Sequence, residues 1–137
     1  CLHAVLKPMT AAGYGKAIFL ATDAGRTPTP ATSIGGAATA GLFFFIRAAG
    51  KELARKGVRL NGIGVPLTAE TESWTRYKSG EDLSPVHVKA YAKAEAATPF
   101  RMTVPSDLAE AALFLASPQS DQISGAVLSV NGGLSFP

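Results

Sequence analysis

The sequence feature that most constrains the fold is an alternation of short apolar runs with segments of helical periodicity. Three runs are apolar on successive residues, as strands buried on both faces of a parallel sheet are. They cover residues 16–22, 58–65 and 126–130. The helical segments cover residues 2–10, 33–56 and 107–116. Alternation of this kind predicts right-handed βαβ crossovers and an α/β fold with a parallel sheet.

The chain begins inside a helical pattern. Leu2, Leu6 and Met9 recur at helical spacing, and no capping residue stands before them. The first residue is Cys1 rather than Met, so we expect that the chain was processed or that a further segment precedes it. Cys1 is also the single cysteine, which excludes an intrachain disulfide and a thiolate metal cluster. This cysteine content favours a reducing compartment, and we expect a cytoplasmic protein without a signal peptide.

The helix predicted over residues 33–56 is apolar on more than one face, and Gly57 stands where a helix would end. We interpret one face as packing on the sheet and the other as packing on a partner subunit. The alternative is one thick core within a single chain. Its most apolar stretch, residues 34–46, is interrupted by glycines and stops at Arg47. That stretch is too short to predict a membrane span.

Residues 66–105 show no sustained period and contain Trp74, Tyr77, His87 and Tyr91. Connections of this length are usually lids or binding loops with short helices of their own. Ser106 is the expected N-cap of the helix over residues 107–116.

Charge and composition exclude some classes of function. The 13 basic and 10 acidic residues are scattered, with a net charge of +3 and no Lys/Arg run, so nothing indicates nucleic-acid binding. With 47% apolar and 17% charged residues the chain is typical of a globular domain. The carboxylates of Asp23, Asp107, Glu110 and Asp121 form no metal-ligand pattern, and Asp107 is placed to interact with the start of its own helix.

Several sequence blocks resemble one known family. Phe-Leu-Ala-Ser-Pro at residues 114–118, Ile-Ser-Gly at 123–125 and Val-Asn-Gly-Gly at 130–133 resemble the closing signature of short-chain dehydrogenases/reductases. Residues 50–61 resemble the passage from that family's long helix into its sixth strand. The resemblance implies that residues 1–137 are the carboxyl-terminal part of one Rossmann-like, doubly wound domain, containing strands five to seven.

The resemblance also implies an amino-terminal half that this sequence does not contain. No G-x-G-x-x-G phosphate turn lies between a strand and a helix, and the family's catalytic Asn would fall before Cys1. Without a neighbouring fourth strand, the strand over residues 16–22 would have an open, apolar edge. We therefore expect an amino-terminal segment or a second chain to complete the sheet.

Members of this family use a Ser at the end of the fifth strand, a Tyr thirteen residues later and a Lys four residues beyond the Tyr. Thr22 occupies the Ser position, Gly35 the Tyr position and Thr39 the Lys position. Gly35 cannot transfer a proton, and Thr39 carries no charge that would lower a phenol pKa. Loss of general acid–base catalysis costs roughly a hundred- to ten-thousandfold in rate.

The family's Pro-Gly turn after the sixth strand is also replaced, here by Val65 and Pro66. Tyr77 or His87 could substitute for the lost groups if the lid folds over a pocket, but a packing role is the favoured interpretation. The residues predicted to line a substrate pocket are Thr22, Thr68, Trp74 and Tyr77.

Three functional hypotheses follow. The first is a non-catalytic subunit of a heteromeric dehydrogenase, in which NAD(P) binds an active partner rather than this chain. It would form homo- or hetero-oligomers through helices 2–10 and 33–56 and would contribute to binding an acyl-CoA-like substrate. The second is an NAD(P)-dependent oxidoreductase whose cofactor-binding half lies on a preceding segment. The third is a remnant of a longer protein.

Overall fold

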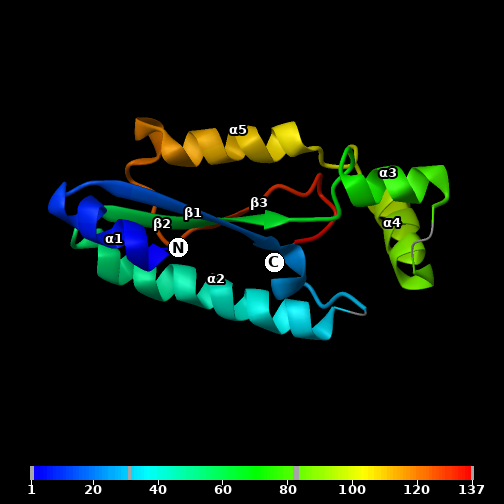
Figure 1. Cartoon of the computed structure of the whole chain (residues 1–137), viewed down its shortest axis with the longest axis horizontal. Coiled ribbons are helices and arrows are strands. Elements are labelled where there is room, and N and C mark those ends of the chain that lie inside the picture. Colours follow the sequence, from blue (N-terminus) through cyan, green and yellow to red (C-terminus); the bar gives the residue numbers. More distant parts are fainter. Residues whose placement is uncertain (1, 31, 82–83, 137) are drawn as a thin grey trace.

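Three parallel strands form a single sheet in the computed structural model, which describes residues 2–30, 32–81 and 84–136 (Figure 1). The strands are β1 (Gly15–Thr22), β2 (Val58–Val65) and β3 (Val127–Ser129), in the order β1-β2-β3. β1 pairs with β2 from Gly15↔Val58 to Thr22↔Val65. β3 pairs only with residues 62–64 of β2. The α/β fold with a parallel sheet is therefore confirmed.

Helices cover both faces of this sheet. α1 (Leu2–Ala11) and α2 (Ser33–Ala54) lie on one face, and α5 (Pro105–Ala116) lies on the other (Figure 1). The core between α2 and the sheet contains Phe43, Ile46 and Leu53 from the helix, packed with Val58 and Leu60 of β2. Burying these side chains stabilises the fold by about 1.5–3 kcal/mol each.

The ends of two helices differ from the prediction. α2 ends at Ala54 rather than at residue 56, because Arg55 to Gly57 already form a turn that Gly57 completes with a φ of 75°. α5 begins at Pro105, so the predicted N-cap role of Ser106 is wrong and Val104 is the N-cap residue. Proline suits the first helical position because the N–H there has no partner within the helix.

Residues 66–105 contain two helices, α3 (Glu72–Ser79) and α4 (Pro85–Ala97), which lie beyond the carboxyl ends of the strands (Figure 1). We call α3 and α4 the lid. The two connections to the lid lie side by side, because Ala69 N donates a hydrogen bond to Thr103 O at 2.8 Å. Short helices within this connection were predicted, and they are present.

Two apolar surfaces are uncovered within the described residues. On α2, Ile34, Phe44 and Phe45 are 87%, 67% and 43% exposed, and the choice between a partner subunit and one thick core stays a prediction. On β1, no described strand pairs with the outer edge, and Leu20 is 57% exposed. The open edge predicted from the sequence is therefore confirmed for the described chain.

By length and composition alone, the 22-residue α2 could span a membrane, with a mean hydropathy of 1.3 over its most apolar window. The prediction from residues 34–46 underestimated this length. The core helix of a soluble protein passes the same test, and α2 packs Phe43, Ile46 and Leu53 against the sheet.

Candidate functional site

The carboxyl edge of the sheet begins at Thr22, the last residue of β1. Its side-chain oxygen accepts a hydrogen bond from Ala24 N at 3.3 Å and caps the short 3-10 turn η1 (Asp23–Gly25). Thr22 is exposed. The hydroxyl that stands in the family's Ser position therefore still faces outward at the end of a parallel strand, where open α/β sheets bind their ligands.

Gly35 and Thr39 lie one helical turn apart in the first part of α2. A Cβ added at Gly35 would meet no atom within 4 Å, so the Tyr position is open space. The Thr39 hydroxyl donates to Gly35 O at 2.8 Å, and so bonds the backbone of its own helix. Thr39 also lies against Gly25, where an added Cβ would come within 2.6 Å of Thr39 Oγ1. These two positions therefore offer neither a phenol nor an ammonium.

A shallow cleft of about 360 Å³ runs between the loop after η1 and the first turns of α2. The residues that α2 contributes to this cleft all have small side chains. At Gly36 the helix lies so close to the turn that an added Cβ would be 2.8 Å from Ala24 O. Its lining combines small residues with three hydroxyl groups and one arginine, namely Ala24, Gly25, Arg26, Pro28, Thr29, Thr32, Ser33, Gly36, Ala37 and Ala40.

Asp23, which follows Thr22, is a buried carboxylate for which no role was predicted. It is 7% exposed, and its Oδ2 accepts hydrogen bonds from Asn131 Nδ2 at 2.7 Å and Ser135 Oγ at 3.4 Å. Its Oδ1 has no hydrogen-bond partner. An acidic residue placed directly after a buried strand was the signal that would have found it.

Arg26 is a cation held between α2 and the end of the sheet. Its guanidinium donates to Ser129 Oγ at 2.8 Å and to Val127 O, and lies 5.2 Å from the centre of the Phe43 ring. Among the described residues, no carboxylate forms an ion pair with it. Arg26 therefore fixes the loop after β1 onto β3, while the nearby Lys position holds only Thr39.

The remaining predicted pocket residues lie in or next to the lid. Thr68 is 7% exposed and donates to Pro66 O at 3.0 Å. Trp74 and Tyr77 of α3 contact the buried ring of Tyr91 of α4, with centroid distances of 5.7 and 5.2 Å. These contacts hold α3 against α4, and the structure does not bring the two rings together with Thr22 in a described cavity. Their role in binding substrate stays a prediction.

His87 and Lys78 also contact neighbours within the lid. His87 Nδ1 lies 2.8 Å from Ser84 Oγ at the start of α4. Lys78 Nζ lies over the Trp74 ring at 4.7 Å and pairs with Glu95 at 2.6 Å. These geometries agree with the interpretation of the lid residues as packing residues.

A second open cavity, of about 470 Å³, lies between the start of α5 and the turn after β3. Arg101 forms a two-pronged ion pair with Asp107 at 2.7 and 2.6 Å. The hydrogen bonds from Arg101 and, to a smaller extent, from the N–H of Val104 together lower the pKa of Asp107 to about 2. The predicted interaction of Asp107 with its own helix start is therefore confirmed, through its 2.9 Å bond to Val104 N.

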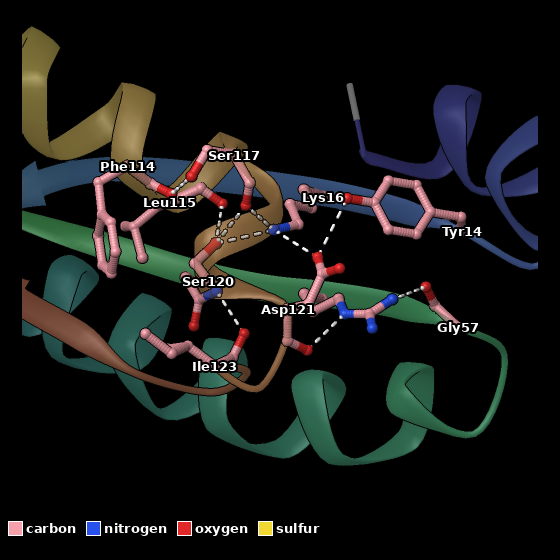
Figure 2. A network of polar contacts seen from close by, with 11 residues as sticks. Tyr14, Lys16, Gly57, Phe114, Leu115, Ser117, Ser120, Asp121 and Ile123 are labelled. Carbon is pink, nitrogen blue, oxygen red and sulfur yellow. Dashed lines mark hydrogen bonds and ion pairs between the residues drawn. The ribbon is translucent and has the colours of Figure 1, made fainter.

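A polar network closes the opposite, amino end of the sheet (Figure 2). Lys16, whose side chain is 6% exposed, pairs with Asp121 at 2.8 Å and donates to Ser120 Oγ at 2.8 Å and to Ser117 O. Tyr14 OH also donates to Asp121, at 3.1 Å. The bond from Lys16 holds the pKa of Asp121 below its usual value.

Comparisons with known proteins agree with this architecture. A family profile described as enoyl-(acyl carrier protein) reductase matches residues 1–135. The chain belongs to the short-chain dehydrogenase/reductase family. It is 35% identical over 133 residues to a 3-oxoacyl-(acyl-carrier-protein) reductase of Chlamydia trachomatis, covering 96% of this chain and 49% of that protein. It is 33% identical to a sorbitol dehydrogenase of Cereibacter sphaeroides, covering 96% and 53%.

Solved structures of the family superpose well on this chain. A short-chain oxidoreductase from Pseudomonas aeruginosa, solved with NADPH and described as containing an atypical catalytic center, is 30% identical with a TM-score of 0.83. The match covers 99% of this chain and 52% of that one. A family member from Burkholderia thailandensis is 27% identical with a TM-score of 0.80, covering 97% and 49%. The chain thus spans about half the length of the relatives it matches.

The family implies a nicotinamide cofactor, and the described residues do not by themselves fit one. The Lys position that would hold a ribose carries Thr39, whose hydroxyl bonds Gly35 O. We therefore derive no hydride-transfer step from these residues. The described residues also include no group of three or more His, Cys, Asp or Glu that could hold a metal ion.

Proposed function

We propose that this chain is a non-catalytic, short-chain-dehydrogenase-like subunit that supports the assembly of an NAD(P)-dependent dehydrogenase. One observation carries the proposal: the Tyr position is open space at Gly35, and the Lys position holds a hydroxyl bonded to its own helix. Neither position can deliver a proton to a substrate oxygen. NAD(P) is then bound by an active partner, and this chain contributes at most to binding a bulky substrate such as an acyl-CoA.

The exposed face of α2 supports the assembly role. Phe44 and Phe45 are 67% and 43% exposed, and Val5 of α1 is 41% exposed on the same side of the sheet. Large exposed apolar side chains that gather on one face indicate a protein–protein contact. We propose that α1 and α2 pack against another subunit of the same family, in the cytoplasm.

The second candidate function is an oxidoreductase that uses other residues and has its cofactor half on a preceding segment. The specific observation in its favour is the NADPH-bound relative with an atypical catalytic center, which matches 99% of this chain. The exposed Thr22 at the end of β1 is the remaining hydroxyl of the family's set.

The deciding experiment separates chemistry from assembly. Intact mass is measured first, to establish that the purified chain has the sequence under test. The chain is then titrated with NADH and NADPH, alone and co-expressed with a full-length family member that has an intact Tyr-x-x-x-Lys. We expect no saturable cofactor binding by the chain alone and no turnover of a 3-oxoacyl thioester.

Two variants make the result specific. Thr22→Val removes the hydroxyl in the family's Ser position and should leave the activity of the co-expressed assembly unchanged. Phe44→Asp places a charge on the exposed α2 face and should abolish co-purification. Turnover by the isolated chain, or a loss of activity in the assembly with Thr22→Val, would overturn the proposal in favour of the oxidoreductase.

A further inference from the structure

The residues after β3 turn back across the carboxyl edge of the sheet. We call residues 131–136 the strap. Because the strand order is β1-β2-β3 and all three strands are parallel, a contact between the strap and the end of β1 must cross the end of β2. Figure 1 shows this path, with the chain end returning to lie near η1. The strap thus covers the edge where open α/β sheets bind ligands.

One buried pair attaches the strap to β1. Asn131, 6% exposed, donates from Nδ2 to Asp23 Oδ2 at 2.7 Å and to Ser135 O at 2.8 Å. Its Oδ1 accepts from Gly133 N at 3.1 Å. One amide group therefore organises the turn of the strap and bonds it to the carboxylate after β1. Two further bonds join this loop to the strap, and both are long: Ser135 Oγ donates to Asp23 Oδ2 at 3.4 Å, and Thr27 Oγ1 donates to Phe136 O at 3.5 Å.

The carboxylate of Asp23 is only partly compensated. Its Oδ1 is buried without a donor and occupies space that Gly64 leaves free, since a Cβ there would lie 2.2 Å from Oδ1. A buried carboxylate oxygen without a donor destabilises the folded state, so the hydrogen bond from Asn131 to Oδ2 offsets a large part of the cost of burying Asp23. Removing that one donor should therefore release the strap while leaving β2 paired.

We propose that residues 131–136 form a latched strap over the carboxyl edge of the sheet, and that the Asp23–Asn131 hydrogen bond is the latch. The strap opens as a unit, without unfolding of the β1–β2 pair. Anything that binds above the ends of β1 and β2 has to displace it. This inference is independent of whether the chain is catalytic.

Native-state amide hydrogen exchange, followed by NMR, tests the latch on the intact chain. Asn131→Asp keeps the shape of the side chain and its acceptor for Gly133 N, but it replaces the donor with a second carboxylate facing Asp23. The exchange of the Gly133 and Leu134 amides should accelerate roughly tenfold or more, because hydrogen bonds to charged groups are worth at least that factor. The amides of β2 should keep their protection.

Two further variants keep the test decisive. The double variant Asp23→Asn/Asn131→Asp reverses donor and acceptor between residues 23 and 131 but cannot donate to Ser135 O, so it should restore part of the protection that Asn131→Asp removes. Asp121→Asn makes the same change as Asp23→Asn, from carboxylate to amide, at the opposite end of the sheet and should leave the exchange of the strap amides unchanged. The latch is wrong if Asn131→Asp leaves the exchange of the strap amides unchanged. If that variant also exposes β2, the reversed pair decides: rescue supports the latch, and failure to rescue overturns it.

Discussion

The two ends of the same sheet are built very differently. At the amino end, the ammonium of the buried Lys16 contacts the Asp121 carboxylate, the Ser120 hydroxyl and the Ser117 carbonyl, so it has three hydrogen-bond acceptors. At the carboxyl end, Gly35 leaves its position empty and the Thr39 hydroxyl bonds its own helix. The amino end thus joins β1 to the segment after α5 through charged groups, whereas Gly35 and Thr39 provide no charged group at the carboxyl end.

The largest effect is expected at the amino end. Lys16→Met would leave the Ser117 carbonyl and the buried Ser120 hydroxyl without their charged donor, so the free energy of unfolding should fall by about 3 kcal/mol. Urea denaturation followed by circular dichroism measures this loss. Lys51→Met, at an exposed position of α2, is the control and should stay within about 0.5 kcal/mol of the parent. Equal effects of the two changes would remove the contrast between the ends.

At the carboxyl end, the close contact between Asp23 and β2 should contribute more to stability than Gly35 or Thr39. A methyl group at Gly64 would displace Asp23 Oδ1, so Gly64→Ala should cost about 2 kcal/mol in the same denaturation experiment. Gly41→Ala, where an added Cβ meets no atom within 4 Å, is the matched control and should not destabilise the chain. An unchanged unfolding midpoint in Gly64→Ala would show that Asp23 is not held against β2.

The empty Tyr position makes the opposite prediction. A side chain at residue 35 meets open space, and alanine is a better helix former than glycine. Gly35→Ala should therefore raise the free energy of unfolding by about 0.5 kcal/mol. A loss of stability would mean that residue 35 is packed against a neighbour, and it would contradict the description of this position as open space.

The smallest effect is expected on the stability of the chain at acidic pH. The carboxyls of Asp107 and Asp121 have folded-state pKa values below their usual 3.8, about 2 in the case of Asp107. Their stabilisation is therefore complete above the usual pKa and is lost as the pH falls through the folded-state value. Thermal melts between pH 5 and pH 2 should show a decline in the parent that is weaker in Asp107→Asn. Parallel declines would show that this exposed pair contributes nothing measurable.

The sequence predicted the framework because its signals are local. The apolar run at residues 58–65 matches β2 at both ends, and Gly57 has the positive φ that its place after a helix requires. Ser106 was mistaken for a helix cap because a preferred capping residue lies near the true start, whereas the structure uses Asp107 to bond Val104 N. Residue preferences at helix ends predict that a helix begins nearby, but they do not fix its first residue.

The site was predicted only in part, because its contacts join distant parts of the chain. The assignment of Thr22, Gly35 and Thr39 to the family's three positions rests on spacing along the chain and stays a prediction, while their geometry needed the fold. The bond between Asp23 and Asn131 joins residues 108 positions apart, and no periodicity reports such a pair. The edge-to-face contact of Trp74 with Tyr91 and the stacking of Tyr77 on Tyr91 could not be predicted either, since each aromatic residue alone suggested a pocket as readily as packing.

The pairing of the sheet has a consequence for how fast this chain can fold. The β1–β2 register joins residues 15 and 58, and the β2–β3 register joins residues 62 and 127, so every strand pair closes a long loop. Chains dominated by such distant contacts fold slowly, because loop-closure entropy must be lost before any pairing is formed. During that time the eight residues of β1 are an unprotected strand. Refolding yield should therefore fall as the protein concentration rises.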